Sequence, residues 1–267
     1  MTLLSDQADA VRALVESADP GAAWAVGGPD GPHAGSGTAD DVHDVGGLTA
    51  VLALWPAVGT LVDEGALRLH TPLTAYGDEA AADTPAGTTA HHLLTHPGGT
   101  AALTRLVEHL CGSTLAELAA VRVWNPLGMT RTRLAEGTLR APLADLALFL
   151  GHLLHPSGPG AARPAEAGGD ATAPAPLTPA WTAESLRIRT GELTPARGLL
   201  WHPAPHGVWT HHAPTDPGPA VWISPRLHRW AVLLPAAGGP LRTTFREAVF
   251  TADGAARSSG PGGVPRA

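Results

Sequence analysis

Residues 46–64 form the most hydrophobic helical pattern in the chain, and any fold must enclose them. Apolar side chains lie on most sides of this predicted helix, which is typical of a helix buried at the centre of a domain. They are Leu48, Val51, Leu52, Leu54, Trp55, Val58, Leu61 and Val62. We expect Asp44 to cap the helix and Gly65 to end it in a left-handed conformation. Pro56 should kink the helix or end its first half.

The other patterns predict strands near both ends of the chain and helices between them. Segments typical of strands occupy 22–28, 34–38, 207–212, 220–224 and 229–235. Helical patterns occupy 5–18, 90–96, 101–111, 114–124, 141–155 and 241–250. This order predicts an α/β (α+β) fold in which the terminal strands form one antiparallel sheet. The first and last helices would cover a face of that sheet, and the middle of the chain would form a helical lobe.

We expect a single domain over residues 1–253. Its sheet lobe would comprise 1–45 and 181–253, and its helical lobe 46–155. Residues 156–180 are rich in Pro, Gly and Ala, which favours a flexible loop. The Gly- and Ser-containing residues 254–267 predict a disordered tail.

Charge and composition narrow the classes of partner. The formal net charge is −7 and no basic stripe is present, so neither nucleic acid nor an anionic membrane is an expected partner. The N-terminus lacks the pattern of a signal peptide, and no apolar run is long enough to span a membrane, which favours a cytoplasmic location. Cys111 is the only cysteine, so no disulfide can form within the chain.

The sequence contains no lysine, because all 17 basic residues are arginines. Arginine holds its proton too tightly to act as a general base at neutral pH. Schiff-base chemistry, serine–lysine dyads and phosphate-binding lysines are therefore excluded. The chain also has a single tyrosine, Tyr76.

Several strings, in order along the chain, resemble the serine β-lactamase-like superfamily, in particular class C β-lactamases, esterases and D-alanyl carboxypeptidase relatives. They are LVDEGALRLHTPL (61–73), HHLLTHPGG (91–99), VWNPLGMTRT (123–132) and, more weakly, LADLALFLGHLL (143–154) and AVWISPRLHRWAVLL (220–234). Each string alone is a weak signal, but their shared order and spacing make the resemblance specific. It covers most of residues 20–250 and implies the fold of that superfamily.

The resemblance also implies where a nucleophile and its base would lie. The superfamily uses a serine at the start of the central helix and a lysine three residues later, which one helical turn brings to the same face. Counting back from Gly65, these positions fall on Gly47 and Ala50. Thr49 has a hydroxyl, but its position in the helix turns it toward another face.

The other two motifs of the superfamily are degenerate as well. The Tyr-x-Asn segment is missing, because Gly99 leads almost directly into the next helix, and this shortens the helical lobe. The Lys/His-Thr-Gly strand corresponds to residues 211–218, where His212 remains and Asp216 follows. Pro214 and Pro217 remove N–H donors from the place where an oxyanion would be held.

The histidines are candidate metal ligands and candidate pocket residues. His91, His92 and His96 include an i, i+4 pair on one predicted helix face, but no HExxH glutamate accompanies them, so we expect no metal and no cofactor. Further histidines cluster near the C-terminal strands at His202, His206, His211, His212 and His228. Adjacent residues of a strand face opposite sides, so at most one of a neighbouring pair faces a pocket. We assign that role to His212.

These observations predict a catalytically inactive homologue of the serine hydrolases that binds a small molecule or a protein. Gly47, Ala50, His212 and Asp216 are its candidate pocket residues. One alternative is a repurposed isomerase, cyclase or lyase that uses His212 or Asp216 for acid–base chemistry. A residual esterase and a decaying paralogue without a selected function are further alternatives.

Overall fold

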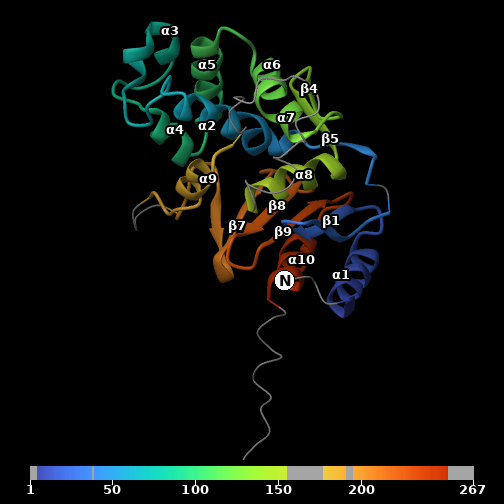
Figure 1. Ribbon diagram of the computed structural model, residues 1–267. Helices are drawn as coiled ribbons and strands as arrows, with labels where there is room; N and C mark the ends of the chain where they lie inside the picture. Colours follow the sequence, from blue (N-terminus) through green and yellow to red (C-terminus); the bar gives the residue numbers. More distant parts are fainter. Residues whose placement is uncertain (1–4, 38, 155–176, 191–194, 252–267) are drawn as a thin grey trace, which may run out of the picture.

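The computed structural model describes residues 5–37, 39–154, 177–190 and 195–251 (Figure 1). Its helices are α1 (Ser5–Ala18), α2 (Trp55–Asp63), α3 (Asp78–Ala81), α4 (Ala90–Thr95), α5 (Thr100–Cys111), α6 (Leu115–Ala119), α7 (Asn125–Leu127), α8 (Leu143–Leu154), α9 (Pro179–Ser185) and α10 (Leu241–Phe250). Its strands are β1 (Ala23–Gly28), β2 (Gly31–Gly35), β3 (Val42–Asp44), β4 (Arg133–Ala135), β5 (Thr138–Pro142), β6 (His202–Ala204), β7 (Val208–His212), β8 (Ala220–Ser224) and β9 (Arg229–Leu234).

The main sheet joins strands from the two ends of the chain. Its strand order is β2-β1-β9-β8-β7-β6, and every neighbouring pair is antiparallel. Strand β1 pairs with β9, with Ala25 opposite Val232. The expected single antiparallel sheet of terminal strands is therefore confirmed.

Both faces of the sheet are covered, so β1, β8 and β9 are buried along their whole length. Alternate residues of β8 pack into different hydrophobic cores. Val221 and Ile223 of β8 pack in the cluster that contains the buried helix 46–64, whereas Ala220 and Trp222 pack against the terminal helices. Figure 1 shows α1 and α10 on one side of the sheet and α8 with the helical lobe on the other.

The first and last helices pack side by side. The Gln7 side-chain amide of α1 donates to the carbonyls of Ala248 and Val249 in α10, at 2.9 and 3.1 Å. Phe245 of α10 meets Trp24 of β1 edge to face, with ring centroids 6.1 Å apart. These contacts join the two ends of the chain through one small hydrophobic core.

The buried helix changes its winding at the expected proline. A 3₁₀ turn over Gly46–Leu48 and a π-helical turn over Ala50–Leu54 precede α2, which has Pro56 in its first turn. Pro56 lacks an N–H group, so the Leu52 carbonyl loses its partner within an α-helix. The indole N–H of Trp124 donates to that carbonyl at 2.8 Å instead. The disturbance predicted at Pro56 is thus a π turn before α2. The Trp124 side chain supplies the hydrogen bond that the Leu52 carbonyl lacks within the helix.

Trp55, at the first residue of α2, is the centre of an aromatic cluster. It stacks on Trp181 of α9 with ring centroids 5.9 Å apart, and its edge contacts reach Trp201 at 5.9 Å and Phe149 of α8 at 6.3 Å. Its indole N–H donates to the Ser185 hydroxyl at 2.8 Å, and both residues are fully buried. The cluster holds α9 and the segment around Trp201 against the central helix.

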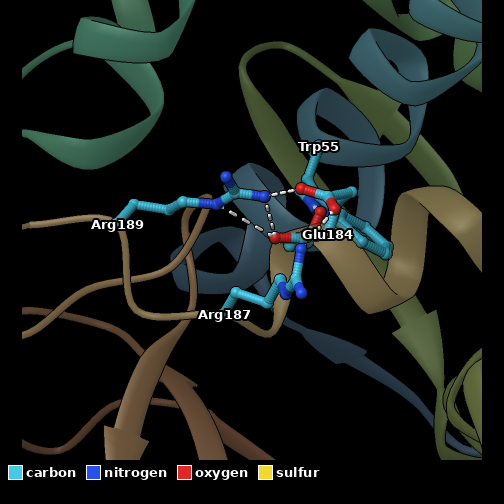
Figure 2. A network of polar contacts seen from close by, with 5 residues as sticks. Trp55, Glu184, Arg187 and Arg189 are labelled. Carbon is cyan, nitrogen blue, oxygen red and sulfur yellow. Dashed lines mark hydrogen bonds and ion pairs between the residues drawn. The ribbon is translucent and has the colours of Figure 1, made fainter.

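Charged residues lie near Trp55 at the end of α9 (Figure 2). The Glu184 carboxylate pairs with Arg187 and with Arg189. Arg189 Nη2 also donates to the Glu184 carbonyl at 3.0 Å. The guanidinium groups thereby fix the end of α9, from which Ser185 reaches Trp55.

Some elements differ from the prediction. A three-stranded sheet, ordered β3-β5-β4, occupies Val42–Asp44 and residues 133–142 and was not expected. Residues 141–142 are strand rather than helix, because they pair with β3, so α8 begins at Leu143. Helix α9 was also missed; the Thr178 side chain caps it by accepting from the Trp181 N–H at 3.1 Å.

Most of the expected flexible loop and all of the expected tail lie outside the described residues. Only residues 177–180 of that loop are described, and they enter α9. Within the described ranges, no helix has the length and hydrophobicity that crossing a bilayer requires.

Replacing Ser185 with Ala should destabilise the protein, because the Trp55 indole N–H would be buried without an acceptor. We expect the free energy of unfolding to fall by about 1–3 kcal/mol, measured by urea denaturation. The exposed Thr243 of α10 serves as a matched control, and Thr243→Ala should change stability by less than about 0.5 kcal/mol. Equal effects of the two substitutions would show that the Trp55–Ser185 bond is unimportant.

Candidate functional site

The start of the buried helix is where the resemblance implies a nucleophile. The Asp44 carboxylate accepts a hydrogen bond from the Gly46 N–H at 2.9 Å. The N-cap of this turn is Val45, which makes no side-chain cap bond, so the expected cap at Asp44 is wrong by one residue. Thr49 Oγ1 donates to the Gly46 carbonyl at 2.8 Å. The hydroxyl nearest to Gly47 in sequence is therefore turned back onto the helix itself.

The space beside Gly47 is filled by the loop between β7 and β8, residues 213–219. A Cβ atom on Gly47 would lie 2.4 Å from Ala213 Cβ, 3.1 Å from Ala213 Cα and 3.3 Å from Pro219 Cγ. Favourable carbon–carbon contacts lie at about 3.5–4.0 Å. Position 47 therefore has no room for a side chain, serine included, while the loop keeps this conformation.

The second dyad position, Ala50, is half-buried at the first residue of the π turn. Its carbonyl accepts the Trp55 N–H, and its side chain is a methyl group. Gly47 and Ala50 thus place no nucleophile and no proton acceptor on this face of the helix.

Hydrogen bonds hold the 213–219 loop in place. The Ala213 N–H donates to the Pro219 carbonyl at 2.9 Å, which closes the loop on itself. The exposed Asp216 accepts from the Gly239 N–H at 3.2 Å. Asp216 therefore links two surface segments and does not face the helix start.

Arg242 of α10 binds the same loop from outside. Its Nη2 donates to the Gly218 carbonyl at 3.0 Å and to the Thr215 carbonyl at 3.3 Å. Its Nη1 lies 3.3 Å from His212 Nδ1. The loop conformation that covers Gly47 is thus stabilised by a helix of the terminal pair.

His212, to which we assigned the pocket, lies exposed at the end of β7. Its Nδ1 is 2.9 Å from the Ala213 carbonyl, to which it can donate, or it can accept from Arg242, but it cannot do both at once. Its ring stacks on His202 with centroids 6.3 Å apart.

His211 is the histidine beside Gly47, where the resemblance implies a nucleophile. Its Nδ1 lies 2.7 Å from the Leu200 carbonyl, and its ring also forms a hydrogen bond with the Gly47 backbone. Strand alternation allowed one inward-facing histidine, and the structure gives that place to His211 rather than His212. The physical reason is the register of β7, in which His211 lies opposite Val221, whose side chain faces the main core.

A cavity of about 130 Å³ lies between the α4–α5 loop, the segment before β6, and β7. Its basic side chains are His96, Arg197, His202 and His211. Among the described residues that line it, none carries a carboxylate. None of Gly47, Ala50, His212 and Asp216 belongs to the lining.

The apolar walls of this cavity come from Leu94, Leu200 and Trp201. Leu200 has a φ of +63°, a left-handed conformation that is costly for a bulky residue. Its N–H donates to the Leu94 carbonyl at 2.8 Å, and its own carbonyl meets His211. These two hydrogen bonds hold Leu200 in its strained conformation. The next residue, Trp201, is fully buried.

Little in the sequence predicts this cavity. Arg197 and Trp201 belong to no motif, and only the histidine cluster pointed toward the region. The residues come together because the chain between α9 and β6 folds back on α4. That packing depends on tertiary contacts that no local pattern encodes.

Burial governs the titration of two histidines here. Burial lowers the pKa of His202 to about 4, and the positive field of Arg197 acts in the same direction. Burial likewise lowers the pKa of His211 to about 4, although its hydrogen bonds with the Leu200 and Gly47 backbones oppose the change. Both rings are therefore neutral hydrogen-bonding groups at neutral pH.

A larger cavity, of about 220 Å³, lies between the β6–β7 turn and α10. Its charged lining residues, Arg246 and Glu247, pair with each other at 3.3 Å. It also reaches Thr251, the last described residue. The smaller cavity is the candidate site because Arg197 in its lining has no ion pair among the described residues, and because its lining residue His211 bonds the Gly47 backbone at the helix start.

The described residues offer no group of three or more His, Cys, Asp or Glu that would hold a metal ion. His96 of the expected histidine pair lies 3.0 Å through Nδ1 from the His92 carbonyl. Tyr76 is also engaged: its hydroxyl accepts from the Arg68 N–H at 2.8 Å. It therefore braces the segment after α2 and does not enter the site.

Comparison with solved structures identifies the fold. The chain aligns with a β-lactamase from Sulfitobacter sp. EE-36 at 13% identity and a TM-score of 0.71, over 92% of this chain and 96% of the other. A class C β-lactamase from Rhodobacter sphaeroides aligns at 13% identity and 0.70, over 93% and 99%. A D-alanine carboxypeptidase from Burkholderia cenocepacia aligns at 16% identity and 0.67, over 91% and 99%.

No protein-family model matches the sequence, and no curated protein matches it either. The structural alignments are nevertheless nearly complete over both partners. The chain therefore has the α/β fold of serine β-lactamases and penicillin-binding proteins, with its antiparallel sheet and flanking helices.

Adding a methyl group at Gly47 should destabilise the protein, because it would collide with Ala213. We expect Gly47→Ala to lower the free energy of unfolding by about 1–3 kcal/mol, measured by urea denaturation. Adding Ala213→Gly to that variant should recover part of the loss, giving a coupling energy in a double-mutant cycle. Gly37→Ala, at an exposed position with open space around it, is the control. Additive effects at 47 and 213 would contradict the contact.

The stability of the protein should fall as the pH drops from about 6.5 toward 4. In this window the unfolded chain binds protons on His202 and His211, whereas the folded protein keeps both neutral. The loss is at most on the order of 1 kcal/mol per pH unit for each histidine. Urea denaturation at several pH values should show a shallower slope for the His202→Gln/His211→Asn variant. An unchanged slope would contradict this account.

Proposed function

We propose that this chain is a non-hydrolysing protein with the β-lactamase fold that binds a small molecule or a partner protein. The observation that carries the proposal is the contact between Ala213 and position 47. Acyl transfer in this fold needs a hydroxyl at that place, and the described loop conformation leaves no space for one.

The base is missing as well as the nucleophile. Ala50 occupies the position of the lysine, and the whole sequence contains no lysine that another segment could supply. Removal of either partner of a nucleophile–base pair costs most of its activity. The lack of both a nucleophile and a base on one helix face favours binding without a covalent step.

Acid–base catalysis by His212 or Asp216 is less well supported. That alternative needs at least one of the two to face a cavity, and both are exposed on the loop side. Two of the histidines that do line the cavity, His202 and His211, have pKa values of about 4. A general base or acid works best with a pKa near the working pH.

A residual esterase would need another hydroxyl near the helix start. Thr49 is the nearest in sequence, and its Oγ1 is bonded to the Gly46 carbonyl. No specific observation favours this alternative over the binding protein.

The proposal is tested by covalent labelling of the full chain. We expect no mass shift after incubation with a fluorophosphonate probe or with benzylpenicillin, followed by intact-protein mass spectrometry. An active serine β-lactamase treated in parallel is the positive control. A stoichiometric adduct would overturn the proposal, and its loss in Thr49→Ala would identify Thr49 as a residual nucleophile.

A further inference from the structure

The 130 Å³ cavity presents one permanent positive charge without a matching negative one. Arg197 is half-buried in its lining, and the described residues include no ion pair to its guanidinium. A guanidinium withdrawn from water needs acceptor oxygens to replace the solvent it has lost. The cavity is therefore suited to an anion.

A second donor in the lining also lacks a partner. Trp201 is fully buried, and its indole N–H forms no hydrogen bond with the described residues. A buried donor without an acceptor costs roughly 1–3 kcal/mol, and indole nitrogen can only donate. Trp201 and Arg197 both line the same cavity, and the indole N–H and the guanidinium both require an oxygen acceptor.

The first turn of α5 adds further donors at the cavity edge. Gly98 and Thr100 belong to the lining, and no side chain caps this twelve-residue helix. Its first N–H groups are open to an acceptor, and the positive end of the helix favours an anion.

The size and the walls limit the rest of the ligand. A cavity of about this volume accommodates a group the size of benzene. Leu94, Leu200 and the Trp201 ring provide apolar surface next to the charged end. The site therefore combines one cationic end with an apolar wall.

We propose that this cavity binds a small organic monocarboxylate, with its carboxylate at Arg197 and the Trp201 indole N–H and its apolar part against Leu94 and Leu200. The inference deepens the proposed function, on which it rests, by naming the ligand class of the binding protein. It involves no covalent step.

The charge of the site favours a carboxylate over phosphate. Two half-buried histidines of the lining, His202 and His211, are neutral at neutral pH, because burial lowers their pKa values. Arg197 is then the one fixed positive side chain among the lining residues described. A single positive charge matches a monoanion, whereas a phosphate dianion would keep an uncompensated charge in a partly buried site.

Titration of the full-length protein with benzoate, followed by the tryptophan indole N–H signals in a ¹H–¹⁵N NMR spectrum, tests this assignment. Trp201→Phe identifies the Trp201 signal. We expect benzoate to shift that signal saturably, and neutral benzamide to bind at least about tenfold more weakly. Arg197→Gln should raise the Kd for benzoate at least about tenfold, a loss of about 1.4 kcal/mol.

Arg133→Gln is the matched control, because Arg133 is exposed on β4 and its loss changes the net charge equally. Its Kd should stay within about twofold of the unmodified protein. If Arg197→Gln fails to fold, Arg197→Lys, which keeps the charge but loses the planar fork, should still weaken binding. An unmoved Trp201 signal, an unchanged Kd on loss of Arg197, or tighter binding of inorganic phosphate than of benzoate would overturn the assignment.

Failure of this inference is distinguishable from failure of the proposed function. Covalent labelling reports on the helix start at Gly47, whereas the titration reports reversible occupancy at Trp201. An adduct together with benzoate binding would overturn only the proposal that the protein does not hydrolyse. No adduct and no benzoate binding would overturn only the ligand class.

Discussion

The aromatic packing around Trp55 is the interaction on which the rest of the molecule depends. This one side chain stacks on Trp181, meets Trp201 and Phe149 edge to face, and donates its N–H to Ser185. It thereby connects the central helix with α8, with α9 and with the segment that forms the candidate cavity. Aromatic pairs of this kind contribute about 0.5–1.5 kcal/mol each beyond burial, so the cluster fixes relative positions that hydrophobic burial alone would leave open.

The same helix explains why the candidate cavity does not lie at Gly47. Its first turn runs past the 213–219 loop so closely that only glycine fits at position 47, because Ala213 Cβ occupies the space of a side chain. Arg242 of α10 stabilises that loop through two carbonyls. A contact between the loop and the helix start thus takes the place where a nucleophile would stand. The open space lies further along the sheet edge, where Trp201 rather than Gly47 forms the wall.

Much of this fold could be predicted because its signals are local. Alternating and helical patterns place the sheet strands and the terminal helices, and Pro56 marks the change in helix winding. The small sheet of β3, β4 and β5 was missed because strands of three to five residues carry too little pattern. The site was harder, since the choice between His211 and His212 depends on strand register. Arg197 and Trp201 enter it through tertiary packing alone.

The absence of lysine and the low pKa values of His202 and His211 have the same consequence for the cavity. Neither a lysine nor either of these histidines supplies it with a proton acceptor that works at neutral pH. A proton acceptor that works at neutral pH needs a pKa near 7, and arginine is far above that value. Burial takes His202 and His211 far below it, to about 4. Arg197 therefore stays charged and the two histidines stay neutral, so none of the three exchanges a proton readily at neutral pH. Groups with fixed protonation states are well suited to holding an anion, and this is why binding explains the cavity better than acid–base catalysis does.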